Sequence, residues 1–295
     1  MTRQNSPVSF VDRKQVARRF SRVAQSYAGA DFFAREVDRR MQERLDYVRL
    51  VPARILDMGC SCGGSSDALA ARYPDALQFG VDTSEAMLRA GRPERGVWSR
   101  WFGRQQGMQR IAADASALPL QSRSMGLVWS NLMLHWLDSP LPALAEAHRV
   151  LEVGGLLMFS TLGPDTLREL NQAFGDGYAH TQRFTDMHDL GDMLVESGFS
   201  DPVVDMEMIT LTYDDLDSLF GELRAAGSSC AMQARRHTLT GAKRFAAARL
   251  AYEAMRSHGK LPASFELIYG HAWKVAPKQL ADGRSVVQFD LRPKR

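Results

Sequence analysis

The sequence of 295 residues has no long hydrophobic run and only three cysteines. No apolar stretch approaches the roughly 18 to 20 residues that a membrane-spanning helix needs. The segment from Met1 to Pro7 carries no apolar signal sequence. Three cysteines are too few for a disulfide framework, and there is no internal repeat or low-complexity linker. These absences argue against an integral membrane protein and a disulfide-stabilised secreted domain, so we expect a soluble, cytoplasmic protein without membrane association.

A strong excess of one charge is also missing. The net charge is only +3, so the composition gives no reason to expect a nucleic-acid partner. The basic residues nevertheless form two clusters. The first contains Arg13, Lys14, Arg18, Arg19 and Arg22, and the second contains Arg92, Arg95, Arg100, Arg104 and Arg110, interleaved with Trp98, Trp101 and Phe102. Segment 91–110 is longer than a simple helix-to-strand connection needs, and it is either a partner-binding loop or a solvated loop.

The most informative segment has the sequence ILDMGCSCGG and begins at Ile55. An apolar run that ends in small residues, followed by helical spacing, predicts a strand, a tight turn and a helix. The segment does not match the G-x-G-x-x-G pattern of dinucleotide sites. It contains an acid instead, in the arrangement Asp57-x-Gly59-x-Ser61-x-Gly63. This resembles the D/E-x-G-x-G-x-G pattern of S-adenosylmethionine (SAM) methyltransferases, with serine in place of the middle glycine, and it predicts SAM as cofactor.

Two further acids follow apolar runs and support the same prediction. Asp82, followed by Thr83, is placed to accept hydrogen bonds from both hydroxyls of a ribose. Asp114, followed by Ala115, lies where the methyltransferase pattern puts a side chain on the adenine amino group. Asn131 follows a later run and is a candidate either to bind the cofactor or to cap the next segment. Because the carboxyl ends of parallel strands meet at one edge of a sheet, these residues predict a single site.

Ser61 places a Cβ atom and a hydroxyl where the backbone usually passes beneath the methionine part of SAM. If Ser61 adopts a positive φ, the strain is on the order of 1 kcal/mol. Weakened SAM binding and loss of the cofactor site are therefore both open. Cys60 and Cys62 lie in the same turn, and with only Cys230 to join them we expect small turn residues and no metal site.

The periodicity of apolar residues predicts an α/β fold with parallel strands. The expected strands are 54–58, 77–81, 109–112, 126–130 and 155–161, with strand-like runs at 203–212 and 265–275. The expected helices are 64–72, 84–90, 140–151, 164–174, 186–197, 214–226 and 241–257. We expect one elaborated domain, made of a helical N-terminal cap (1–50), a Rossmann-like cofactor-binding core (51–162) and the remaining strands with a helical lid (163–295). Helices 214–257 would form an insertion over the strand ends and, with the cap, exclude water.

Beyond the cofactor motifs, the chain resembles the malonyl-[acyl-carrier protein] O-methyltransferases of biotin synthesis (BioC). The segments that carry this resemblance are Val16 to Phe20 with Tyr27, Asp57 to Gly63, Val128 to Leu132 with His135 and Trp136, Phe159 to Leu162, Leu167 to Leu170, Arg183 and Phe184, Ile209 to Leu211 with Asp214 and Asp215, Leu239 and Thr240, and Phe265 to Gly270. The resemblance implies a class I SAM-dependent methyltransferase with a mostly parallel seven-stranded sheet. It also implies methyl transfer to the free carboxylate of malonyl-acyl carrier protein or malonyl-CoA. The carrier protein in that family is acidic, so the basic clusters are candidates for docking it.

The same resemblance suggests three catalytic residues, each with a structural alternative. Arg183 would hold the malonyl carboxylate, or it would pair with Asp186 or Asp189. Tyr27 would close over the cofactor and donate its hydroxyl to the substrate, and His135 would line the pocket, or both would simply pack. A related branch, the mitochondrial complex I assembly factors, keeps the SAM site but hydroxylates an arginine of a partner protein. A protein-modifying role, SAM binding without catalysis and small-molecule methylation therefore stay open, and the oligomeric state is unknown.

Overall fold

The computed structural model describes residues 10–91 and 107–276, and within them strands and helices alternate as predicted. The strands are β1 (Arg54–Met58), β2 (Leu77–Asp82), β3 (Gln109–Ala112), β4 (Met125–Ser130), β5 (Leu151–Leu162), β6 (Ser200–Tyr213) and β7 (Leu261–Trp273). The helices are α1 (Arg13–Val23), α2 (Phe32–Arg44), α3 (Ser66–Arg72), α4 (Glu85–Ala90), α5 (Leu141–Val150), α6 (Arg168–Phe174), α7 (Met187–Glu196), α8 (Leu216–Ala225) and α9 (Ala242–Glu253). Their ends differ from the predicted ones by a few residues. No helix in the described ranges has the length and apolar character that crossing a membrane requires.

All seven strands form one sheet in the order β3-β2-β1-β4-β5-β7-β6. Strands β1 to β5 are parallel to one another. Only β7 runs in the opposite direction, antiparallel to both β5 and β6. This confirms the predicted mostly parallel seven-stranded sheet. The chain reverses its direction of winding between β1 and β4. In open α/β sheets, ligands bind outside the carboxyl ends of the strands at such a reversal, which is where β1 leads into the glycine turn.

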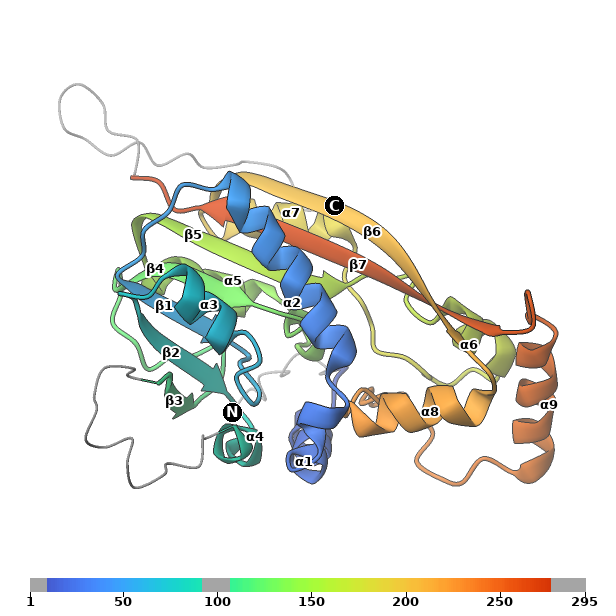
Figure 1. Ribbon diagram of the computed structural model, residues 1–295. Helices are drawn as coiled ribbons and strands as arrows, with labels where there is room; N and C mark the ends of the chain where they lie inside the picture. The colour runs from blue at the N-terminus through green and yellow to red at the C-terminus, as the bar shows by residue number, and fades with distance from the viewer. Residues whose placement is uncertain (1–9, 92–106, 277–295) are drawn as a thin grey trace, which may run out of the picture.

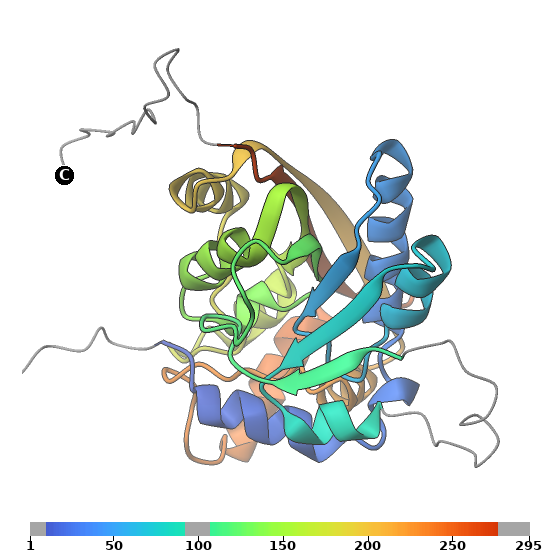
Figure 2. The same ribbon diagram turned by 90° about the vertical axis from the view of Figure 1, so that its left-hand side faces the viewer.

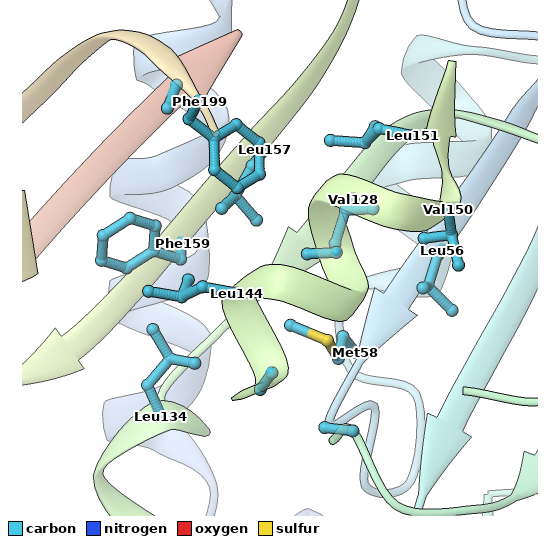
Figure 3. Packing of buried hydrophobic residues seen from close by; sticks show 14 of the residues in the cluster. Leu56, Met58, Val128, Leu134, Leu144, Val150, Leu151, Leu157, Phe159 and Phe199 are labelled. Carbon is cyan, nitrogen blue, oxygen red and sulfur yellow. The ribbon is translucent and has the colours of Figure 1, made fainter. Parts of the chain in front are cut away.

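Helices cover both faces of the sheet, as Figures 1 and 2 show: α2 and α3 lie on one face, and α5 and α7 on the other. Strands β1, β4 and β5 are therefore buried on both sides, which is why they read as nearly continuous apolar runs. Figure 3 shows the packing of one face, where Leu56 and Val128 of neighbouring strands meet Leu144 of α5 and Phe199.

The N-terminal cap is fastened to the core by a buried polar network. Trp129 of β4 is fully buried, and its indole N–H donates to Asp38 of α2 at 3.0 Å. The Ser65 hydroxyl donates to the same carboxylate at 2.6 Å. Burial raises the pKa of Asp38, while these two hydrogen bonds favour its ionised form. The network holds α2 against the sheet, beside the carboxyl ends of the strands.

The insertion between β6 and β7 contains α8 and α9, and the two helices have different surroundings. Helix α8 runs back from the far end of the sheet towards α1, whereas α9 packs against α6 at the periphery (Figure 1). Residues of α8 line the central cavity, and no residue of α9 does. The predicted lid therefore includes α8 but not α9.

Candidate cofactor and substrate site

A cavity of about 680 Å³ lies at the carboxyl ends of the central strands, beneath α1, α2 and α8. The predicted cofactor residues line one half of it. The other half is mainly apolar, with the side chains of Leu162, Leu167, Leu170, Phe174, Phe220 and Phe265. Of the sequence-predicted site residues, all except Gly63 and Arg183 line this cavity. The cavity thus joins a polar half and an apolar half, as a site for two different ligands requires.

The glycine turn after β1 is held against the end of β2. The N–H groups of Gly59 and Cys60 donate to the Val81 carbonyl at 2.8 and 3.0 Å, and the Ser61 N–H donates to the Asp82 carboxylate at 2.9 Å. Gly59 has φ +85°, and a Cβ atom there would overlap the side chain of Met133. Ser61 has φ +50°, so it does adopt the strained conformation that the sequence raised as a condition. Its hydroxyl oxygen is buried and has no hydrogen bond of ordinary geometry to residues 10–91 or 107–276.

Gly63 and Arg110 stabilise the turn from outside the cavity. The Arg110 guanidinium donates to the carbonyls of Cys62 and Gly91 at 3.0 and 2.8 Å, and a Cβ atom on Gly63 would lie 2.6 Å from it. The sequence counted Arg110 in the basic segment 91–110, left open as a partner-binding or a solvated loop, and also in the expected strand 109–112; in the structure Arg110 belongs to β3 and ties the turn to the end of α4. The other basic and aromatic residues of that predicted loop, Arg92, Arg95, Trp98, Arg100, Trp101, Phe102 and Arg104, lie outside the described residues.

The polar half of the cavity is rich in carboxylates. Asp57 is only 4% exposed, and its pKa is raised well above its usual range by burial and by the nearby Asp38 and Asp82, against the attraction of Arg110. Burial also raises the pKa of Asp82, although the N–H groups of Ser84 and Ser61 donate to its carboxylate and favour its ionised form. Raised carboxyl pKa values mean that ionisation is poorly compensated here. A cationic ligand would supply the missing compensation.

Asp114 marks the opposite end of the polar half, where α1 closes over the cavity. Its carboxylate accepts the Ser116 N–H at 2.9 Å and is ion-paired with Arg13 of α1. Burial opposes ionisation, but the Ser116 N–H and Arg13 outweigh it, so the pKa of Asp114 is lowered. Helix α1 also lies beside α4 (Figure 2). Two members of the first basic cluster, Arg13 and Lys14, thus line the cavity, and Arg13 is ion-paired there with Asp114.

Tyr27 and His135 line the cavity near the glycine turn. Burial raises the pKa of Tyr27 to about 12, with the nearby Ser61 hydroxyl acting in the opposite direction. Burial lowers the pKa of His135 to about 3, and its Nδ1 lies 3.4 Å from the Thr161 hydroxyl. At neutral pH the first is a neutral phenol and the second a neutral imidazole. Both are suited to shaping the cavity and to hydrogen bonding.

Asn131 lines the cavity, but its amide is already engaged by the protein. It donates to the Ala34 carbonyl of α2 at 2.8 Å and accepts the Ser160 hydroxyl at 2.7 Å. These contacts tie α2 to the ends of β4 and β5, and neither of them caps the next segment; the role in cofactor binding stays a prediction.

Arg183 is exposed and does not line the cavity. Its guanidinium lies over the ring of Phe10, 4.8 Å from the centroid. Among the residues that the structure describes, it forms no ion pair with Asp186 or Asp189, and Asp186 instead caps α7 by accepting the His188 N–H at 2.8 Å. This placement does not support the hypothesis that Arg183 holds the substrate, nor the alternative ion pair.

Comparison with known proteins identifies the family. A methyltransferase-domain profile matches residues 56–159. A malonyl-[acyl-carrier protein] O-methyltransferase from Gallionella capsiferriformans is 43% identical over 286 residues, which cover 96% of this chain and 98% of the relative. A second, from Laribacter hongkongensis, is 44% identical over 288 residues, covering 95% and 96%. The chain belongs to this family.

The family assignment agrees with the fold. The crystal structure of the YcgJ protein from Bacillus subtilis superposes with a TM-score of 0.56 over 82% of this chain and 99% of its own, at 15% identity. The chain is thus a SAM-dependent methyltransferase with a Rossmann-like fold, as the glycine turn predicted. The motifs that suggested this family lie within the methyltransferase domain and also before and after it. The relatives match nearly the whole chain, which confirms the resemblance.

The polar half of the cavity fits SAM. SAM carries a cationic sulfonium and an ammonium group, which suit the uncompensated Asp57 and Asp82. Gly59, with no Cβ, permits close approach of the backbone to a ligand. Asp82 would hold the ribose and Asp114 the adenine amino group. The buried Ser61 hydroxyl lies close to the Tyr27 phenol but has no hydrogen bond of ordinary geometry within the described residues, so a bound ligand would be able to supply one.

The carboxylates in the polar half of the cavity predict that SAM affinity falls as the pH is lowered. The pKa values of Asp57 and Asp82 are raised without ligand, and a bound cation lowers them again, so protonation competes with SAM. SAM affinity should begin to fall at pH values above the ordinary range of carboxyl pKa values. For each proton taken up, the affinity should fall by up to about tenfold per pH unit. S-adenosylhomocysteine (SAH) lacks the sulfonium charge and should show a shallower dependence. Calorimetric titration of both ligands at intervals of about one pH unit, from about pH 5 to about pH 8, would measure this. Parallel plots of affinity against pH for SAM and SAH would contradict it.

Replacing Ser61 with glycine should stabilise the protein. Glycine adopts φ +50° without the clash that a Cβ atom causes, so we expect a gain of about 1 kcal/mol. In a chain of this size that corresponds to a rise of about 2–4 °C in melting temperature by scanning calorimetry. Ser61→Ala, which keeps the Cβ atom and removes the hydroxyl, is the control and should show no such rise. An equal gain in both variants would show that the buried hydroxyl, and not the backbone, is the source of strain.

Proposed function

We propose that this protein transfers the methyl group of SAM to the free carboxylate of a malonyl group carried on an acyl carrier protein. The observation that carries the proposal is the extent of the similarity: relatives named for this activity match 95–96% of the chain, whereas the general methyltransferase domain spans only residues 56–159. The matched part therefore includes the segments that line the apolar half of the cavity. The relatives' names support carboxyl methylation over the alternative of a protein-modifying assembly factor.

The chemistry of a carboxylate substrate agrees with the groups around the cavity. A carboxyl group with an ordinary pKa of about 4 is already ionised at neutral pH, so no general base is required to activate it. His135, with a pKa lowered to about 3, and Tyr27, with a pKa raised to about 12, are not expected to change protonation state near neutral pH. SAM supplies an activated methyl group when bound. The protein's contribution is to position the carboxylate oxygen in line with that methyl and to exclude water.

An aromatic wall favours the exclusion of water. Phe20 of α1 packs edge-on against Trp136 with ring centroids 5.1 Å apart, and Trp136 lies against His135, also at 5.1 Å. His135 in turn packs near Phe184 at 5.9 Å. This wall joins α1 to the segment after β4, and all four of its side chains line the cavity.

Mass spectrometry of the carrier protein tests the proposal. Malonyl-carrier protein incubated with the protein and SAM should gain the mass of one methyl group, with SAH formed in equal amount. Butyryl-carrier protein, which has no carboxylate, should gain none. Malonyl-CoA in a parallel reaction shows whether the carrier is needed. No gain on malonyl-carrier protein, despite measured SAM binding, would sink the proposal.

A further inference from the structure

A cluster of three interacting polar side chains lies behind the apolar half of the cavity, and one of the three, His180, lines that cavity. His180 Nε2 lies 2.8 Å from one oxygen of Asp176, and the Arg236 guanidinium lies 3.1 Å from the other. All three side chains are largely buried, with 17%, 14% and 13% exposure for His180, Asp176 and Arg236. Arg236 also lies over the ring of Tyr178 at 4.0 Å. The cluster is therefore fixed on both sides of the Asp176 carboxylate.

His180 is the member that lines the cavity, and its ring is stacked on Phe174 with centroids 4.2 Å apart. Its second ring nitrogen, Nδ1, makes no hydrogen bond within the described residues. That nitrogen is thus free to bind a ligand.

The other basic side chains along the described cavity wall are engaged or peripheral. Arg13 is ion-paired with Asp114, and Arg35 is ion-paired with Asp31 at 3.3 Å. Lys14 and Arg224 are exposed. Arg183, the anchor predicted from sequence, lies outside the cavity. A substrate carboxylate that enters the apolar half still needs a donor, because burying it without one is costly.

We propose that His180, held by Asp176, binds the carboxylate of the malonyl substrate. The proposal rests on the proposed function. With Nε2–H donated to Asp176, Nδ1 can donate only when the ring is an imidazolium. Carboxylates on both ring nitrogens, one from Asp176 and one from the substrate, stabilise that form. Asp176 is well suited to this, because His180 and Arg236 hold its own pKa at about 2.

A single imidazolium donor also suits the reaction. One N–H binds one carboxylate oxygen and leaves the other free to attack the methyl group. An arginine fork would bind both oxygens and reduce the nucleophilicity of both. The charged groups that face His180 within the described residues are Asp176 and, beyond it, Arg236; Arg244 of α9 lines a shallow hollow beside Asp176. Asp176 and Arg236 balance each other, so protonated His180 leaves one net positive charge at the cavity wall.

His180→Ala tests the proposal. Its KM for malonyl-carrier protein should rise by about 10- to 150-fold, the range for losing a hydrogen bond to a charged group. SAM affinity should stay unchanged. Inhibition by butyryl-carrier protein should also stay unchanged, because a butyryl group is similar in length but has no carboxylate. His188→Ala, an exposed histidine of α7 outside the cavity, is the matched control and should resemble the parent protein.

Asp176→Asn provides a second readout. The amide can still accept from His180 but no longer favours the imidazolium, so the rise in KM for malonyl-carrier protein with increasing pH should begin at a lower pH than in the parent. Equal loss of malonyl and butyryl binding in His180→Ala, or an unchanged pH profile in Asp176→Asn, would overturn the proposal. If the parent protein binds SAM but never methylates malonyl-carrier protein, the proposed function itself fails.

Discussion

Replacement of Asp82 by alanine is expected to weaken SAM binding by about 100-fold or more. The carboxylate lies at the end of β2, accepts the N–H groups of Ser61 and Ser84 at 2.9 and 2.8 Å, and lines the cavity. It therefore both holds the glycine turn and would accept the ribose hydroxyls. Each hydrogen bond to a charged group contributes about 1.5–3 kcal/mol, and losing two of them exceeds a hundredfold in affinity.

Calorimetric titration with SAM or SAH measures this effect. Asp75→Ala is the matched control, because Asp75 is an exposed aspartate in the turn before β2 and does not line the cavity. Asp82→Asn keeps the size of the side chain and an acceptor for one N–H group, so it separates loss of charge from collapse of the turn. Unaltered affinity in Asp82→Ala would show that the cofactor lies elsewhere.

Gly59→Ala is expected to lower the free energy of unfolding by about 2–5 kcal/mol and to abolish SAM binding. The residue has φ +85°, which costs about 1–2 kcal/mol for a side chain that carries Cβ. The added atom would also overlap Met133, and such overpacking costs about 1–3 kcal/mol more.

Denaturant unfolding followed by circular dichroism checks this expectation. Gly64→Ala is the control, since Gly64 lies in the same turn, has no positive φ, and a Cβ atom there meets nothing within 4 Å. The two variants differ in local geometry alone. If both lost the same stability, the close approach of Met133 to the turn would not constrain residue 59.

The elements and the cofactor half of the site were predictable from the sequence because their signals are local. Apolar periodicity located the strands, and an acid at the end of a strand points towards the ligand edge wherever the sheet is parallel. Asp57, Asp82 and Asp114 follow this rule and all line the cavity.

The rest depends on contacts that no local pattern specifies. Asp38 and Trp129, which form a hydrogen bond, are 91 positions apart in the sequence. The only sequence signal for this contact was a single acid on the inner face of α2. Arg110 was grouped with a basic segment because its neighbours are basic, yet it is the second residue of β3 and its guanidinium donates to the carbonyls of Cys62 and Gly91. His180 and Arg183 lie in an irregular segment without periodicity, so no sequence pattern decides which of them faces inward. A resemblance drew attention to Arg183, and the structure places His180 in the cavity instead.

The most direct test of the account is to locate the methyl group in the product. SAM with an isotopically labelled methyl group is incubated with malonyl-carrier protein, and the product is then treated with alkali. A methyl ester on the malonyl carboxylate is hydrolysed, so the label should appear as methanol. Label that stays on carbon, nitrogen or the carrier protein itself after this treatment would contradict carboxyl methylation.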